Sequence, residues 1–209
     1  PIAAITGAAE LLQEEMPAER RVRFLSNIQA ETTRMQNVID RLLALSSVEN
    51  RKTLESPARL NLCALAKDVA ETYRPALDAT RGTVLSLKTA GEAWIRGDAV
   101  LLEMAISNLL QNAIEFSPKN ATVTLAIVKD AGKIHLTVKD EGPGIPNYAL
   151  TRVFDHFYSL QRPDSGKKSS GLGLCIVREI MELHGGEASI RNRDPRGTCA
   201  QLEFPNAEN

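Results

Sequence analysis

The first fifty residues carry hydrophobic side chains at intervals of three and four, which is the spacing of one face of an α-helix. The first run of this kind consists of Ile5, Ala9, Leu12 and Met16. Pro17 interrupts the run, because proline fits the first turn of a helix better than its interior. The pattern therefore predicts one helix before Pro17 and a second helix from about Ala18 to about Glu49.

The second predicted helix has a hydrophobic stripe that is too wide for two helices to bury. A seven-residue spacing relates Ile28, Met35 and Leu42, with Val38 and Leu45 three residues beyond the last two. Further hydrophobic residues widen the stripe, namely Phe24, Leu25, Ile39 and Leu43. Pairing of two such hairpins into a four-helix bundle would bury the stripe, so a homodimer is favoured. A single hairpin that packs on the following domain is the alternative.

A linker and a second domain follow the helical pattern. Residues 50–57 are polar, lack periodicity and end in proline, which is typical of a linker. Beyond it, the sequence predicts strands over residues 58–62, 83–88, 93–97, 121–130, 133–140, 187–192 and 198–204. It predicts helices over residues 63–80, from a cap at Asp98 through Ile114, and from Gly171 to His184. The expected fold class is α+β, in which a helical hairpin over residues 1–49 precedes a domain over residues 58–209 whose mixed sheet is covered by helices mainly on one face.

Composition narrows the possible partners. The chain has 209 residues, 43% of them hydrophobic and 24% charged, and its net charge is −1. This balance gives no reason to expect nucleic acid or an anionic membrane as a partner, so any anion site must be local. Three cysteines, Cys63, Cys175 and Cys199, form no Cys-x-x-Cys pair and indicate neither a disulfide framework nor a zinc site. No stretch has the apolar length of a membrane span, and the start at Pro1 without an initiating Met indicates a fragment of a longer protein.

One strand is predicted to end in Asp140-Glu141-Gly142-Pro143-Gly144. Glycine lets the backbone approach a ligand closely, and a neighbouring carboxylate can accept a hydrogen bond from a ligand amine. A simple turn between two elements is the alternative, because Gly-Pro-Gly is ordinary loop sequence.

Two further segments have residue types that suit a metal ion and phosphates. Asn108 and Asn112 lie four residues apart on one face of a predicted helix, and amide oxygens are suitable ligands for Mg²⁺. A pair of polar residues on the flank of the helix is the alternative. Gly171-Leu172-Gly173 directly precedes a helix, where free N–H groups and the helix dipole favour an anion, although a hinge would have the same sequence. The loop before it adds positive charge from Arg162, Lys167 and Lys168.

The order of these segments resembles that of sensor histidine kinases. The asparagine, first glycine, phenylalanine and second glycine boxes of that family are similar to Asn108-Leu-Leu-Gln-Asn112-Ala, Asp140-Glu-Gly142-Pro-Gly144, Phe154-Asp-His-Phe157-Tyr and Gly171-Leu-Gly173-Leu. Gly197-Thr198 is similar to the final glycine-threonine element. Ile2 to Glu49 resembles the dimerisation and phosphoacceptor hairpin. The resemblance thus covers nearly the whole chain.

This resemblance implies an ATP-binding α/β sandwich of the type shared by gyrase, Hsp90, histidine kinases and MutL. Asp140 would accept a hydrogen bond from the adenine amine. Asn112, with Asn108 beside it, would coordinate a Mg²⁺ ion that bridges the phosphates, and the backbone at Gly171 to Gly173 would hold the phosphate chain. The implied nucleotide-binding residues are Asn108, Asn112, Asp140, Gly142, Gly144, Ile145, Phe157, Lys167, Lys168, Gly171, Leu172, Gly173, Leu174 and Thr198.

The phosphoacceptor histidine is the first departure from the family pattern. The pattern places it five residues before the proline that Pro1 matches, so we expect it upstream of this sequence. The three histidines present are predicted on a strand, within the phenylalanine box and at a helix end, namely His135, His156 and His184. None of them can take its place.

The second departure is Glu115 with Phe116, where many relatives carry a basic residue and a tyrosine. A basic side chain there would face the phosphates, and an acid would repel them unless it points away or meets a cation. We therefore expect Lys167 and Lys168 to supply part of the missing positive charge.

The leading hypothesis is the catalytic core of a two-component sensor histidine kinase. It would use Mg-ATP to phosphorylate a histidine and then transfer the phosphoryl group to the receiver domain of a response regulator. We expect a homodimer through residues 1–49, and a cytoplasmic location within an inner-membrane sensor whose membrane segments lie elsewhere. One alternative is another ATPase of the same fold, which the heptad hairpin disfavours. A second is a nucleotide-gated dimerisation and docking module without kinase activity.

Overall fold

The computed structural model describes residues 1–80, 82–89, 91–130, 132–163, 166 and 169–205. The chain divides into two compact units, Pro1–Ser46 and Ser47–Asn209. The predicted nucleotide-binding residues Lys167 and Lys168 lie outside the described residues.

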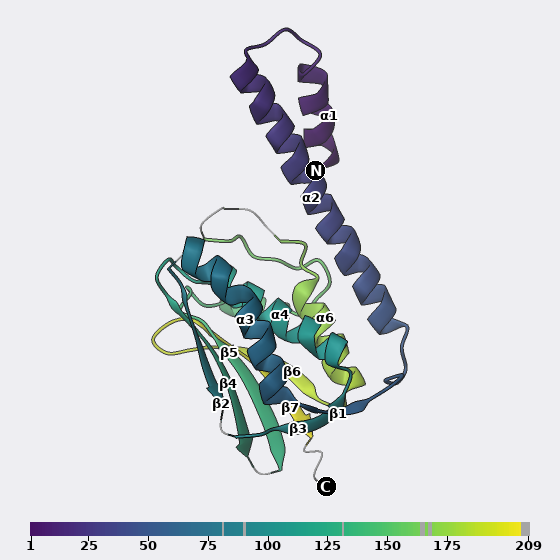
Figure 1. Cartoon of the computed structure of the whole chain (residues 1–209), viewed down its shortest axis with the longest axis vertical. Coiled ribbons are helices and arrows are strands. Elements are labelled where there is room, and N and C mark those ends of the chain that lie inside the picture. Colours follow the sequence, from purple (N-terminus) through teal and green to yellow (C-terminus); the bar gives the residue numbers. More distant parts are fainter. Residues whose placement is uncertain (81, 90, 131, 164–165, 167–168, 206–209) are drawn as a thin grey trace. The chain divides into compact units, whose positions relative to one another are not determined.

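The first unit is a helical hairpin, as the hydrophobic spacing predicted. Helix α1 spans Ile2–Leu11, and α2 spans Ala18–Glu49, of which residues 18–46 belong to the first unit (Figure 1). Within α1, Ala8 is buried and Ala9 is exposed, so the inner face differs by one residue from the predicted one. Several large hydrophobic side chains of the hairpin remain exposed, namely Val22, Leu25, Ile39, Leu42 and Leu43.

A mixed five-stranded sheet forms the frame of the second unit, in the order β2-β4-β5-β7-β6. The strands are β2 (Val84–Thr89), β4 (Thr122–Asp130), β5 (Lys133–Lys139), β6 (Glu187–Asn192) and β7 (Thr198–Pro205). Only the β2-β4 pair is parallel, because the chain crosses over between them, whereas the other neighbours are antiparallel. A separate antiparallel pair joins β1 (Ala58–Asn61) to β3 (Trp94–Gly97).

Helices cover one face of this sheet, as predicted (Figure 1). They are α3 (Leu62–Thr80), α4 (Ala99–Phe116) and α6 (Gly173–Leu183), and a short α5 spans Asn147–Leu150. The reason is the alternation along the central strands: Val123 and Leu125 of β4 and Leu136 of β5 are fully buried, while their neighbours face outward. Burial of one such side chain stabilises the fold by about 1.5–3 kcal/mol.

The beginning of α4 is joined to the end of α6. The side chain of Asp98 caps α4 and accepts hydrogen bonds from the N–H groups of Val100 (2.9 Å) and Leu101 (3.2 Å), as the sequence predicted. The Asp98 N–H in turn donates to Nε2 of the buried His184 at 3.0 Å. Because Nε2 accepts, Nδ1 carries the proton and donates to the Ile180 carbonyl at 2.7 Å. Burial lowers the pKa of His184, in agreement with this neutral form.

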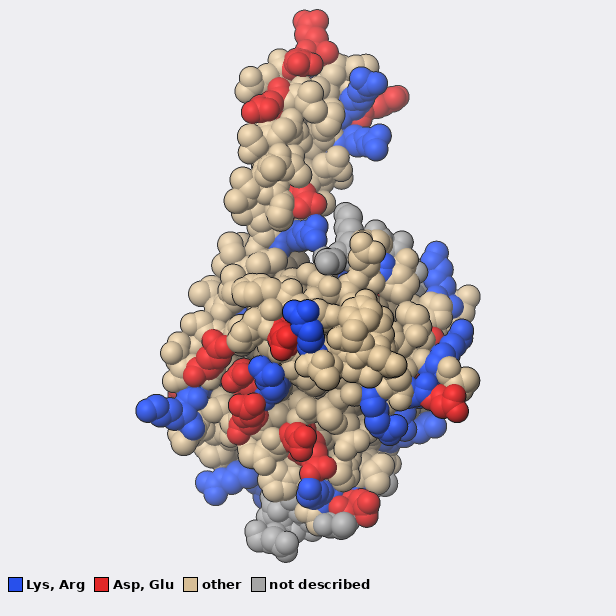
Figure 2. Space-filling view, turned by 180° about the vertical axis from the view of Figure 1, so that it is seen from behind, with Lys and Arg blue, Asp and Glu red and all other residues tan. Residues whose placement is uncertain are grey.

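The surface of the chain carries both signs of charge. On the face that Figure 2 shows, basic and acidic side chains are interspersed. Among the described residues, no helix combines the length and the hydrophobicity that crossing a bilayer requires.

Candidate functional site

Asp140 lies directly after β5 and is held from three sides. It is 3% exposed. Its Oδ1 accepts from the N–H groups of Gly142 at 2.8 Å and Thr198 at 3.1 Å, and its Oδ2 accepts from the Thr198 hydroxyl. A carboxylate has about four lone-pair directions, so Oδ2 keeps one for a further donor. The neighbouring backbone leaves no space for a side chain at Gly197, where a Cβ would lie 2.1 Å from the Asp140 carbonyl oxygen.

The loop after Asp140 is fixed at both ends. At Gly142 a Cβ would lie 2.6 Å from the carbonyl oxygen of Phe116, so only glycine lets the loop pass the end of α4. Further on, the Asn192 amide bonds both backbone groups of Ile145: its Oδ1 accepts from the N–H at 2.7 Å, and its Nδ2 donates to the carbonyl at 2.8 Å. Between these points Gly144 has a φ of +81°, which favours glycine.

The two asparagines of α4 face the beginning of α6. A Cβ at Gly173 would lie 3.0 Å from the Asn108 Oδ1 and 3.9 Å from the Asn112 Nδ2. The Asn108 Nδ2 donates to the Met104 carbonyl at 2.9 Å, which fixes the amide and leaves Oδ1 directed toward α6. An amide oxygen is among the ligands that Mg²⁺ accepts, and the ion usually takes its other ligands from phosphates and water.

The beginning of α6 has the features of an anion site. Leu172 is the N-cap residue and forms no side-chain cap hydrogen bond, so the first N–H groups of the helix have no acceptor from a cap. Gly171 precedes it with a φ of +71°, and a Cβ there would lie 2.4 Å from the carbonyl carbon of Phe157. Phe157 itself is 65% exposed with a φ of +60°, and Leu174 is half-buried in the first turn of α6.

The predicted site residues therefore fall into two neighbouring groups within the second unit. Asp140, Gly142, Gly144, Ile145 and Thr198 form the first, around the ends of β5 and β7. The second is formed by Asn108, Asn112, Phe157, Gly171, Leu172, Gly173 and Leu174, at the meeting point of α4 and α6. Helix α4 joins the groups, because its end contacts Gly142 and its middle contacts Gly173.

Glu115 is paired rather than free. Its Oε1 accepts from Gln111 Nε2 at 3.0 Å, and its Oε2 lies 2.5 Å from Nη2 of Arg162. We expected an acid at this position to point away from the phosphates or to pair with a cation, and Arg162 is that cation. The lysines that we expected to supply the charge lie outside the described residues.

Two further residues that shape the site were not predicted. Asn192 fixes Ile145, and Arg193 Nη1 donates to the Asp140 carbonyl at 2.6 Å. Asn192 is the last residue of β6, and Arg193 begins the turn between β6 and β7. Their separation from Asp140 along the chain exceeds fifty residues, so no local spacing marks them. The pairing of β7 with both β5 and β6 brings them to Asp140.

The histidines do not lie in either group. His135 on β5 contacts Glu203 at 3.6 Å and Gln201 at 3.2 Å. His156 Nε2 lies 3.3 Å from Glu49, and His184 joins α6 to α4. No group of three or more His, Cys, Asp or Glu side chains within the described part of the chain is arranged to hold a metal ion.

Comparison with known families agrees with this geometry. Residues 97–208 match the family of histidine kinase-, DNA gyrase B- and HSP90-like ATPases, and residues 1–51 match the His Kinase A phospho-acceptor domain. The first match covers more than half of the chain, and the chain belongs to this ATPase family. The predicted family and fold class are therefore confirmed.

Particular relatives narrow the likeness to sensor kinases. The sensor protein CreC of Escherichia coli strain K12 is 41% identical over 204 residues, which is 98% of this chain and 42% of that protein. The structure of the mycobacterial sensor histidine kinase MprB is 26% identical with a TM-score of 0.62, over 72% of this chain and 97% of that one. The structure of histidine kinase ThkA in complex with response regulator protein TrrA covers 99% of this chain and 58% of that one, with 23% identity and a TM-score of 0.81. The chain spans less than half the length of CreC.

Proposed function

We propose that this chain is the catalytic core of a two-component sensor histidine kinase that uses Mg-ATP. The observation that carries the proposal is the Asp140 carboxylate, which is buried, held by three donors and left with one acceptor direction. An acceptor so fixed beside a glycine loop suits the amine of adenine. Preorganised polar groups of this kind discriminate well between ligands, because a ligand that lacks the matching donor leaves them buried without a hydrogen-bond partner.

The remaining residues would position the phosphates. The N–H groups at the beginning of α6 would bind the phosphate chain, and Asn112 with Asn108 would hold Mg²⁺. When bound, the ion neutralises charge on the phosphates. Phosphoryl transfer depends mainly on such positioning and electrostatic stabilisation, so the site requires no nucleophile of its own.

Replacement of Asp140 by asparagine tests the adenine assignment. Asparagine keeps the shape but presents a donor or a weaker acceptor, so we expect ATP affinity to fall by about tenfold or more, or the preference for ATP over GTP to disappear. Calorimetric titration with both nucleotides measures this. Asp130→Asn, at the exposed end of β4, is the matched control and should bind as wild type does. Unchanged affinity and preference in Asp140→Asn would contradict the assignment.

Kinase activity needs a phosphoacceptor, so the second test joins the chain to an N-terminal extension that carries the family histidine. With labelled ATP, acid-labile label on that histidine is the expected result. Label on the chain of an Asn112→Ala variant should be lost, since the phosphates are no longer held. ATP turnover without protein label would indicate another ATPase of this fold, and nucleotide-dependent dimerisation without label would indicate a docking module.

We further propose that the hairpin over residues 1–49 forms a homodimer and that the chain binds a response regulator. Residues 50–57 would link the hairpin to the domain over residues 58–209. Its exposed hydrophobic side chains support the dimer. The fold shared with ThkA, whose structure is a complex with its response regulator, supports the second partner. We also propose that the chain is a cytoplasmic core within a membrane-anchored sensor. The likeness in fold to the cytoplasmic segment of histidine kinase QseC supports the cytoplasmic location.

A further inference from the structure

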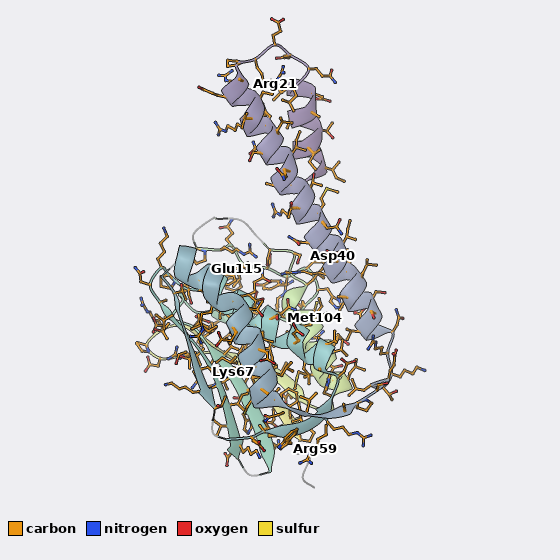
Figure 3. All side chains as sticks on the ribbon, viewed as in Figure 1. Arg21, Asp40, Arg59, Lys67, Met104 and Glu115 are labelled. Atoms are coloured by element: carbon orange, nitrogen blue, oxygen red, sulfur yellow. The ribbon has the colours of Figure 1, made fainter. Side chains whose placement is uncertain are left out.

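Glu115 extends the stripe of α4 that carries the two asparagines. Asn108, Asn112 and Glu115 are separated by four and three residues, so they lie one above the other on one face of the helix. Figure 3 labels Glu115 near the end of α4, with Met104 at an earlier turn. An unpaired carboxylate on this stripe would repel phosphates held at the beginning of α6.

The partner of Glu115 comes from the segment that borders the beginning of α6. Phe157 lies against Gly171, and the Ser159 hydroxyl donates to the Ser169 carbonyl at 3.1 Å. The segment therefore runs beside the residues that lead into α6 before it reaches Arg162. There Nη2 of the guanidinium lies 2.5 Å from Glu115 Oε2, and both side chains are about three quarters buried, at 26% and 23% exposed.

One donor of the Arg162 guanidinium is buried and has no acceptor within the described part of the chain. Its Nε is inaccessible to solvent and has no hydrogen-bond partner among the described residues. A buried donor without an acceptor is unfavourable, and a guanidinium presents donors in a fixed fork that matches phosphate oxygens. The ion pair with Glu115 uses Nη2 rather than Nε, so the guanidinium can pair with Glu115 and bind a phosphate at the same time.

We infer that Arg162 is a phosphate-binding residue of the nucleotide site and that Glu115 is the residue that positions it. The inference rests on the proposed function, because it assigns a residue to the same site. In this arrangement Glu115 does not oppose the phosphates, since its charge is compensated by a cation that faces them. Arg162 supplies its donors from the segment beside α6, in place of a basic side chain on α4 itself.

The test compares ATP with adenosine, which lacks phosphates. Calorimetric titration of Arg162→Ala should show ATP affinity reduced by about tenfold or more, with adenosine affinity unchanged. Arg162→Lys should recover little of the loss, because an ammonium lacks the fork that reaches Glu115 and a phosphate together. Arg152→Ala is the matched control: Arg152 lies in the preceding segment, pairs with Asp155 at 3.3 Å and stacks on Tyr158, and its loss should leave both affinities unchanged.

The positioning role of Glu115 is tested by a double-mutant cycle. In the Arg162→Ala background, Glu115→Gln should strengthen ATP binding severalfold, because it removes an unpaired acid close to the phosphates. In the wild-type background the same change should give no gain, since it also releases Arg162. An equal gain in both backgrounds would show that the residues act independently and would overturn the positioning role.

The outcomes separate this inference from the proposed function. If the wild-type chain binds neither ATP nor adenosine, the proposed function fails. If the wild-type chain binds both and Arg162→Ala binds ATP equally well, only the inference fails. Loss of adenosine binding in Arg162→Ala would also overturn it, since the residue would then support the fold of the site rather than a phosphate.

Discussion

The two units of the chain bury their hydrophobic side chains in different ways. In the second unit Leu125 and Leu136 are completely buried between the sheet and its helices. In the hairpin Val22 and Leu43 each remain 65% exposed. The second unit thus has an extensive core of its own, although Val100 and Phe157 are exposed there. The hairpin buries Ala8 and Leu45 and retains hydrophobic surface of the kind that marks an interaction site. The same residue type should therefore contribute to folding in one unit and to association in the other.

The largest expected effect comes from a cavity in the second unit. Leu136→Ala should lower the free energy of unfolding of that unit by about 2–5 kcal/mol, because the buried site cannot collapse fully around the smaller side chain. The single tryptophan, Trp94 on β3, lies in the same unit and reports its unfolding in urea by fluorescence. Leu43→Ala is the matched control, since its side chain is mostly exposed, and should leave the Trp94 transition unchanged. Equal destabilisation by both changes would remove the distinction between the units.

An intermediate effect is expected from a charge on the hairpin. Leu43→Glu should raise the dissociation constant of the proposed dimer by at least tenfold, because an unpaired carboxylate cannot be buried between helices without a large cost. Analytical ultracentrifugation measures the change, and Trp94 fluorescence should show an unaltered second unit. Asn37→Glu, also exposed on α2, is the control and should leave the dimer intact. A Leu43→Glu chain that dimerises as the wild type does would show that this surface is not the interface.

The units also differ in how much of their structure could be predicted from the sequence. The alternation of residues 121–130 and 133–140 predicted β4 and β5 closely, because a strand with one buried face repeats every second residue. The segment from Asp140 to Gly144 was a candidate ligand loop because it combines a carboxylate with closely spaced glycines, and a simple turn was the alternative. In the hairpin the spacing predicted both helices, but it placed Ala9 inside where Ala8 is buried, since a short amphipathic run fits neighbouring helix faces almost equally well.

Contacts between distant segments could not be predicted. Glu115 and Arg162 are 47 residues apart, and so are Ile145 and Asn192. Neither pair has a local signature, because a single charged or amide side chain occurs equally often on a solvated surface. The pairs depend on where the fold places the segment before α6 and the end of β6. The positive charge of Arg162 was visible in the sequence, but its pairing with Glu115 was not.

The smallest expected effect is a dependence of the free energy of unfolding on pH that arises from a histidine. Only the second unit should show it. The hairpin residues 1–46 contain no histidine, whereas His184 is buried in the second unit between α6 and α4. Burial lowers its pKa below the ordinary value of 6.5, although Asp98 beside it opposes the shift. The unfolded chain therefore takes up a proton at His184 before the folded chain does. Stability from this residue is complete above about pH 6.5 and is lost as the pH falls toward the lowered pKa.

His184→Gln isolates this contribution. Glutamine can accept from the Asp98 N–H through its amide oxygen but does not titrate, so the variant should lose less stability than wild type between pH 7 and pH 5. Urea transitions followed by Trp94 fluorescence across that range give the two slopes. His156→Gln, which changes an exposed histidine paired with Glu49, is the control and should retain the steeper slope of wild type. If His184→Gln and wild type lose stability equally as the pH falls, protonation of the buried histidine does not destabilise the junction of α4 and α6. The pH dependence of this unit's stability must then come from its carboxylates.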